Sequence, residues 1–210
     1  MNADIKNALK DALILLVITL FAGLALGAVH EITSEPIKQQ KQAAVVKSCN
    51  AVFPDEEGFA HVSDFMDAEE GIKDQLGALS FDNGISIGNI YYALDDGGNR
   101  IGYAIEVTSA EGYGGDIKVM CGVTTDGTLR GVSILEISET AGLGMKADSV
   151  LVPQLHNINT DHITFTKTGS TSESEIDAIS GATITTTAFV NMVNAALDVS
   201  GIINAEGGAS

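Results

Sequence analysis

Cysteine is scarce in this chain, which has only Cys49 and Cys121 among its 210 residues. There is no C-x-x-C motif, and the four histidines are scattered along the sequence. Zinc and iron–sulfur sites rich in thiolates need more ligands than this, so the sequence excludes that class of site. Cys121 stands in the apolar run KVMCGV, which is typical of a buried cysteine that packs as a small hydrophobic side chain. One disulfide between the two cysteines is the alternative.

Basic residues are scarce as well, with 11 Lys and Arg against 28 Asp and Glu and a formal net charge of −17. Such a chain repels a phosphate backbone, so we expect no nucleic acid among its partners. In contrast, 45% of the residues are apolar, which is ample for a packed core. The length suits one ordinary domain with an appendage.

The appendage is predicted at the N-terminus, where Ala12 to Val29 form an uncharged apolar run, ALILLVITLFAGLALGAV. At about 1.5 Å per residue, this run nearly crosses a hydrocarbon core of roughly 30 Å. A signal peptide cleaved after Gly27 is the alternative, but the run exceeds the ~7–15 residues of a typical signal h-region. We therefore expect residues 1–30 to form a short tail and an uncleaved transmembrane signal anchor. No second run of this kind is expected, and the flanking lysines do not settle the orientation.

The next segments connect this span to the domain. Residues 31–53 contain Pro36 near an expected helix start and then Gln, Lys and Ala at helical spacing, which predicts a stalk helix or linker. Residues 54–74 are acidic and are expected to be irregular. Their order does not match a calcium-binding EF-hand loop, so we expect a solvated acidic surface and no metal site. The domain itself is expected over residues 54–210.

Two β-hairpins are predicted in this domain. SIGNIYYALDD and RIGYAIEVTSA flank a turn at Gly97-Gly98, and the segment 117–137 has Asp126-Gly127 at its centre. DHITFTK adds a short strand, whereas GMKADSVLVPQLHNI is helical or irregular. The predicted fold class is therefore α+β, an antiparallel β-sheet with flanking helices.

Two glycine-bearing loops stand out between these elements. EGYGGDI, residues 111–117, joins the hairpins, and SETAGLGMK, residues 138–146, follows the last long strand. Glycine lets a backbone approach a ligand closely, and an aromatic side chain such as Tyr113 can cover a flat ring. Neither loop matches G-x-G-x-x-G, and each is alternatively a tight connection. Sequence positions alone do not show that the two loops meet.

The stretch DAISGATITTTAF, from Asp177 to Phe189, is rich in hydroxyl groups although threonine is a mediocre helix former. An apolar stripe that begins at Ile184 predicts a buried helix over about 184–197, with Ser180 at the N-cap position. Thr183 then falls in the first turn, where free N–H groups favour an anion such as phosphate. The alternative is a Ser-capped helix whose first turn is incidentally polar. The other threonines are Thr185, Thr186 and Thr187.

DAISGAT, Asp177 to Thr183, resembles the D-x-x-(S/T)-G-A-T flavinylation motif, in which a transferase attaches FMN to the final threonine through a phosphoester. The motif is similar to that of the RnfG family of the Rnf complex and of the NqrC family of the sodium-pumping NADH:quinone reductase. The single N-terminal span, GYGGDI and ETAGLG occur in the order that these families show, although proline is frequent in them where Ala141 stands here. The compact length is closer to the Rnf family.

The resemblance implies a set of site residues and a cofactor. FMN would be bound covalently to Thr183, and a flavin transferase would recognise the motif residues Asp177, Ser180 and Gly181. Ala182, the other residue of the motif, is expected among the cofactor-binding residues. We expect further contacts with the ring and the phosphate from Tyr113, Glu139, Thr140, Leu143, Gly144 and Lys146.

The implied function is that of a membrane-anchored electron-carrier subunit in an ion-translocating ferredoxin:NAD⁺ oxidoreductase (Rnf) complex, without turnover of its own. Its partners would be the other membrane subunits and, during maturation, the transferase. The resemblance places the FMN domain outside the cytoplasm, on a single span of the cytoplasmic membrane. Alternatives are the corresponding quinone-reductase component, another extracytoplasmic flavin donor, and a non-redox binding or scaffold module.

Overall fold

The structure is a computed structural model that describes residues 3–55, 61–68, 81 and 84–207. The chain divides into two compact units, Met1–Ala44 and Val45–Ser210, which are taken separately below.

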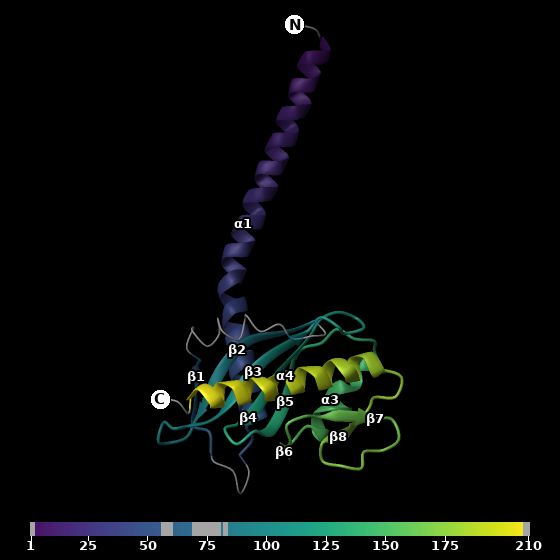
Figure 1. Ribbon diagram of the computed structural model, residues 1–210. Coiled ribbons are helices and arrows are strands. Elements are labelled where there is room, and N and C mark those ends of the chain that lie inside the picture. Colours follow the sequence, from purple (N-terminus) through teal and green to yellow (C-terminus); the bar gives the residue numbers. More distant parts are fainter. Residues whose placement is uncertain (1–2, 56–60, 69–80, 82–83, 208–210) are drawn as a thin grey trace. The chain divides into compact units, whose positions relative to one another are not determined.

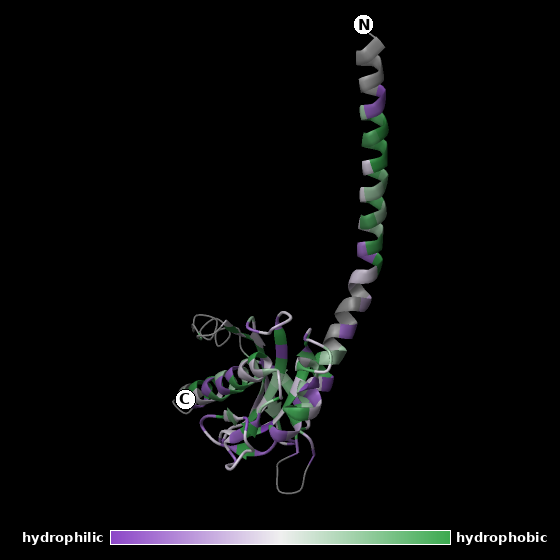
Figure 2. Ribbon diagram, turned by 90° about the vertical axis from the view of Figure 1, so that its right-hand side faces the viewer, coloured by the Kyte–Doolittle hydropathy of each residue, from purple (hydrophilic) through white to green (hydrophobic). Residues whose placement is uncertain are grey.

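The first unit is the larger part of a 50-residue helix, α1 (Ala3–Val52). Within it, Lys10–Ser34 has a mean hydropathy of 2.7 and no burial inside the protein, so it is a candidate membrane span that contains the predicted one. Figure 2 shows the hydrophobic colouring along this segment. The expected stalk helix is not a separate element, because α1 continues through Pro36. A proline inside a helix removes one backbone hydrogen bond and crowds the carbonyl of the preceding turn, so the helix continues here at a local energetic cost.

The second unit is built on a six-stranded antiparallel sheet whose strands lie in chain order. The strands are β1 (Asp64–Asp67), β2 (Ile85–Leu94), β3 (Arg100–Ser109), β4 (Ile117–Thr124), β5 (Thr128–Glu136) and β6 (Ile158–Asn159). Gly98 and Gly127 occupy the β2–β3 and β4–β5 turns at φ of 76° and 87°, which other residues rarely adopt. Both predicted hairpins and the α+β class are confirmed.

Strand β1 lies in the acidic segment that was expected to be irregular. Its four residues carry little strand signal of their own, and they pair because β2 offers an open edge. Phe65 of this strand packs against Phe53, with ring centroids 6.0 Å apart. Most of the remaining acidic segment, 56–60 and 69–74, lies outside the described residues. The expectation of a solvated acidic surface concerns these residues and therefore stays a prediction.

A single long helix, α4 (Thr183–Gly207), crosses one face of this sheet and packs mainly on β3 and β4 (Figure 1). Phe189, Met192 and Val193 of α4 are fully buried in the core. The segment Thr183–Ala205 is long and apolar enough to cross a membrane, contrary to the expectation that only one such run exists. Since 72% of its most apolar window is buried, we assign α4 to the core of the domain.

The end of α1 covers the opposite face of the sheet. Cys49 and Val52 belong to a buried cluster there with Met120 of β4, so the last turns of the predicted stalk are part of the domain core. Gly122 is required at this contact, because a Cβ at that position would collide with the Val52 carbonyl oxygen. Cys121 faces the other cluster, and both cysteines are free.

The segment after β5 approaches α4 through short elements. These are η1 (Gly144–Lys146), α3 (Ala147–Val150), η2 (Val152–Gln154), β7 (Thr164–Thr166) and β8 (Glu175–Asp177). Strands β7 and β8 form a small parallel pair, which confirms the predicted strand in DHITFTK. Asn194 of α4 anchors this region, because its Oδ1 accepts the Ile163 N–H at 2.7 Å and its Nδ2 donates to the Ile163 carbonyl at 2.9 Å.

Candidate functional site

The two glycine loops meet in the structure. The backbone N–H of Tyr113 donates to Oε1 of Glu139 at 2.8 Å. One residue further on, a Cβ at Gly114 would collide with the carbonyl oxygen of Ser138. The loops therefore touch backbone to backbone, which only glycine at position 114 permits. Sequence positions alone could not show that the two loops are in contact.

The turn before α4 joins the same place. Gly181 has φ of 79°, and a Cβ built on it would lie 3.2 Å from Cδ2 of Leu143 in the second loop. A Cβ on Gly144 would lie 2.7 Å from both Oε2 of Glu139 and Oγ1 of Thr185. Glycine at position 144 therefore allows the second loop to approach the first turn of α4 closely.

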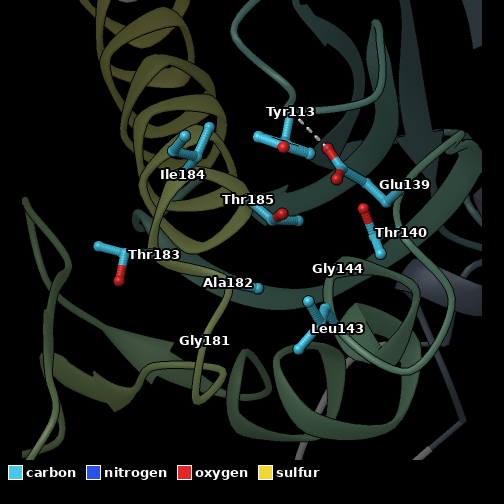
Figure 3. Close-up of a pocket in the computed structure, with 10 residues that line it drawn as sticks. All are labelled: Tyr113, Glu139, Thr140, Leu143, Gly144, Gly181, Ala182, Thr183, Ile184 and Thr185. Carbon is cyan, nitrogen blue, oxygen red and sulfur yellow. Dashed lines mark hydrogen bonds between the residues drawn. The ribbon is translucent and has the colours of Figure 1, made fainter.

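These three segments enclose an open cleft of about 450 Å³. Its walls include exposed apolar side chains, with Tyr113 71%, Ile184 51% and Leu143 40% exposed. In Figure 3, Thr183 lies on one side of the cleft, and Tyr113 and Glu139 lie on the other. Apolar walls with a few polar groups suit a flat heterocyclic ligand. The lining residues are Tyr113, Glu139, Thr140, Leu143, Gly144, Gly181, Ala182, Thr183, Ile184 and Thr185.

The cleft includes eight of the eleven predicted site residues, but not Asp177, Ser180 or Lys146. Ser180 and Lys146 are exposed on the turns beside it. Asp177 ends β8, and its Oδ1 accepts the Ser170 N–H at 2.7 Å. Gln154 clamps the Asp177 backbone from the other side: the Asp177 N–H donates to Gln154 Oε1 at 2.7 Å, and Gln154 Nε2 donates to the Asp177 carbonyl at 3.2 Å. Asp177 therefore belongs to the framework that leads into the cleft.

The N-cap of α4 lies two residues later than the sequence suggested. The Thr186 N–H donates to the Ala182 carbonyl at 3.0 Å, which makes Ala182 the N-cap, so the assignment of Ser180 to that position is wrong. The physical reason is a tight turn, closed by the Ala182 N–H on the Ile179 carbonyl at 3.0 Å. The N–H groups of Thr183 and the next two residues have no partner inside the helix and border the cleft.

The four threonines have different surroundings. Thr186 Oγ1 donates to the Ala182 carbonyl at 2.9 Å and accepts the Ile179 N–H at 3.1 Å, and Thr187 Oγ1 donates to the Thr183 carbonyl at 2.9 Å. These two hydroxyls fasten the start of the helix. Thr183 is half-buried at the cleft, and Thr185 is buried on the cleft side.

Sequence reasoning missed two lining residues as members of the site. Ile184 was expected in the buried stripe but is exposed, because the first turn of α4 borders the cleft rather than the sheet. Thr185 was considered only as an alternative attachment point. Their position in the same helical turn as Thr183 is the signal that could have found them.

The comparisons with known proteins agree with this geometry. Residues 112–198 match the FMN-binding domain, and residues 1–52 match the RnfG N-terminal region. The crystal structure of Shewanella oneidensis NqrC superposes with a TM-score of 0.58 and 14% identity, over 82% of this chain and 100% of that one, so the fold is shared. The two family matches therefore identify an FMN-binding domain that follows an N-terminal helix.

The particular family follows from the full-length relatives. The G subunit of the ion-translocating oxidoreductase complex of Vibrio atlanticus is 32% identical, over 91% of this chain and 90% of that protein. Its Shewanella baltica counterpart is 32% identical over 93% and 89% of the two chains. The G subunit of the Na⁺-translocating ferredoxin:NAD⁺ oxidoreductase complex of Acetobacterium woodii is 29% identical over 93% of both. This chain belongs to the RnfG family, and the predicted resemblance is confirmed.

Proposed function

We propose that this chain is the membrane-anchored, FMN-carrying electron-transfer subunit of an ion-translocating ferredoxin:NAD⁺ oxidoreductase complex, with FMN esterified to Thr183. The observation that carries the proposal is the position of Thr183. It is the first residue of α4, it ends the DAISGAT motif, and it lies half-buried at the rim of the cleft.

The four neighbouring hydroxyls differ in their availability for the ester. Thr185 and Thr186 are 1% and 0% exposed, and the hydroxyl of Thr187 is bonded to the Thr183 carbonyl. Among the described residues, no side chain or backbone group bonds the hydroxyl of Thr183. A phosphate on Thr183 also meets the free N–H groups and the positive end of a 25-residue helix.

The cleft residues suit the rest of the cofactor. Bound FMN supplies the electron-carrying chemistry, and the protein determines how the ring is held. Tyr113, Leu143 and Ile184 offer apolar surface to the flat ring, while Glu139 and Thr140 offer polar groups at one end of the cleft. Lys146 is exposed next to the lining residues and would act through its charge on the approach to the cleft.

The motif residues would act during the attachment of FMN. A flavin transferase would recognise Asp177, Ser180 and Gly181, of which Gly181 holds the turn at positive φ and Asp177 is held by Gln154. The domain would face the outside of the cytoplasmic membrane, anchored by Lys10–Ser34 as a single span. Outside the cytoplasm, a flavin that dissociates could not be replaced from the cytoplasmic pool, and a covalent bond would prevent that loss. The other membrane subunits of the complex would be its redox partners.

The test is co-expression with a flavin transferase, followed by denaturing electrophoresis and peptide mapping. We expect a fluorescent band that survives denaturation, with FMN on the peptide that contains Thr183. Thr183→Val deletes the nucleophile at nearly constant shape and should give a folded, colourless protein. A colourless wild-type protein, or FMN on another threonine, would refute the assignment.

Topology and partners are tested separately. Protease added to intact protoplasts should digest the domain after Ser34, whereas protection until lysis would reverse the orientation. Purification in mild detergent should bring down integral membrane subunits. A wild-type protein that always purifies alone would favour a free-standing flavin donor instead.

A further inference from the structure

The buried hydroxyl of Thr185 is not explained by the packing around it. The side chain is 1% exposed and lines the cleft. Within the part of the chain that the structure describes, its Oγ1 makes no hydrogen bond, although both neighbouring threonines do. Oγ1 of Thr185 is not among the fully buried polar atoms that lack a partner, so this atom is accessible from the cleft.

Stability alone would favour valine at this position. A hydroxyl that faces the cleft without a bond inside the protein adds nothing to the packing that valine, which has nearly the same shape, would not supply. Thr186 is the counterexample in the same turn, because its hydroxyl is fully buried and makes two hydrogen bonds. The unbonded hydroxyl of Thr185 is therefore available to a partner that is not part of this chain.

The hydroxyl of Thr185 lies next to Gly144 and Glu139 of the second loop, on the wall of the cleft. Oγ1 of Thr185 and Oε2 of Glu139 both lie 2.7 Å from the position that a Cβ of Gly144 would take, yet they do not bond to each other. Figure 3 shows Thr185 pointing toward the Glu139 and Thr140 side of the cleft, away from Thr183. Because residue 144 has no Cβ, two polar atoms from different segments can converge on one point of the cleft wall.

We propose that the Thr185 hydroxyl donates a hydrogen bond to a ring carbonyl or ribityl oxygen of the flavin, on the far side of the cleft from the phosphate. Thr185 is a binding residue that orients the flavin after Thr183 has fixed its phosphate end. This inference rests on the proposed function, because it takes the flavin to occupy the cleft.

The experiment measures reversible flavin binding to the full-length Thr183→Val protein in detergent, where no ester forms. Adding Thr185→Val should weaken binding of FMN and of riboflavin alike by about threefold to tenfold, the effect of one hydrogen bond. Thr185→Ser, which keeps the hydroxyl, should restore the affinity. Thr187→Val is the matched control and should leave the affinity unchanged. Lumiflavin, which lacks the ribityl chain, identifies the acceptor. If the acceptor is a ring carbonyl, Thr185→Val should weaken lumiflavin binding as well. If the acceptor is a ribityl oxygen, Thr185→Val should leave lumiflavin binding unchanged.

Several outcomes would overturn the proposal. Equal flavin affinities with and without Thr185→Val would do so. A loss of affinity for FMN but not for riboflavin would also do so, because it would show that the hydroxyl contacts the phosphate. The melting temperature of the ligand-free protein provides the folding control, and Thr185→Val should leave it unchanged or raise it.

A second measurement uses the covalently loaded protein, in case reversible binding is too weak to compare. Thr185→Val should carry FMN at Thr183 but show lower flavin fluorescence anisotropy and stronger quenching by iodide. Wild-type values in the variant would overturn the inference. Failure of the proposed function itself is distinguishable, because the wild-type protein would then carry no flavin.

Discussion

The backbone N–H of Tyr113 and the carboxylate of Glu139, 26 residues apart in sequence, are joined by a hydrogen bond of 2.8 Å. This bond closes the first glycine loop onto the second and places the exposed Tyr113 ring at the mouth of the cleft. The shape of the cleft therefore depends on a carboxylate that acts on a backbone group.

Glu139→Ala should loosen the first loop, because the Tyr113 N–H loses its acceptor. Amide exchange over residues 112–116 should accelerate by about tenfold, as expected for the loss of one charge-assisted hydrogen bond. Hydrogen-exchange mass spectrometry measures this directly. Glu139→Gln keeps an acceptor oxygen and should stay near the wild-type rate, whereas equal acceleration in both variants would contradict a role for this single bond.

Glycine at position 144 should be required for the ligand more than for the fold. Gly144→Ala would place a methyl group 2.7 Å from both Oε2 of Glu139 and Oγ1 of Thr185, so it should displace these cleft residues and reduce FMN content strongly. Gly201→Ala is the matched control, because nothing lies within 4 Å of its Cβ position and alanine should stabilise α4 by up to about 1 kcal/mol. Flavin absorbance per mole of protein and thermal unfolding test both statements. Full flavin loading of Gly144→Ala would show that flavin binding does not depend on glycine at position 144.

Thr186→Val should destabilise the protein by about 1–3 kcal/mol, because it leaves the buried Ile179 N–H without an acceptor. The comparison with Thr185→Val is direct, since both residues are buried in the same turn but only Thr186 is bonded. Unfolding in urea, monitored by circular dichroism, gives the two free energies. Equal losses for the two variants would remove the distinction between a structural and a ligand-facing hydroxyl.

Gln154 should affect flavin attachment through the backbone of Asp177. Gln154→Leu removes both hydrogen bonds of the clamp and should slow attachment by the transferase, even where the protein remains folded. Asn194→Leu is the control, because it removes a similar clamp from Ile163, away from the motif. The rate of flavin incorporation at matched folded fractions is the measurement. Equal rates for the two variants would rule out a positioning role for Gln154.

Alkaline pH should lower the stability of the domain through its cysteines. Burial raises the pKa of the Cys49 and Cys121 thiols to about 12, from an ordinary value of 9.0. The folded protein therefore holds these protons more tightly than the unfolded chain, and the free energy of unfolding falls as the pH rises from 9 toward 12. The slope should reach about 1.4 kcal/mol per pH unit for each thiol. Cys49→Ala and Cys121→Ala should each reduce it in thermal unfolding series, and an unchanged slope would contradict the effect.

Alkylation gives a second measure of the same thiols. Native protein at pH 8 should resist iodoacetamide at both positions, since the thiolate is the reactive form and both side chains are buried. Both should react after denaturation without reduction, because the two cysteines lie on opposite faces of the sheet and are not paired. Reaction that requires a reductant would indicate a disulfide.

Local patterns in the sequence predicted much of this protein. The apolar run of α1, the hairpin turns at Gly98 and Gly127 and the stripe of α4 depend on residues close together in the chain, so each could be assigned from a short window. The motif that ends at Thr183 is also local, and it led to the family before any fold was known. The covalent bond itself stays a prediction.

Long-range contacts decided the rest. Whether β1 pairs depends on the free edge of β2, and whether the end of α1 joins the core depends on the space above Gly122. The position of the α4 N-cap at Ala182 follows from a turn whose closure local propensity did not reveal. The cleft exists because three loops distant in sequence come together around Gly144, so no short window contains it. Sequence periodicity reports which side of a helix is apolar, but only the neighbouring elements determine whether that side meets the core or, as at Ile184, a ligand cleft.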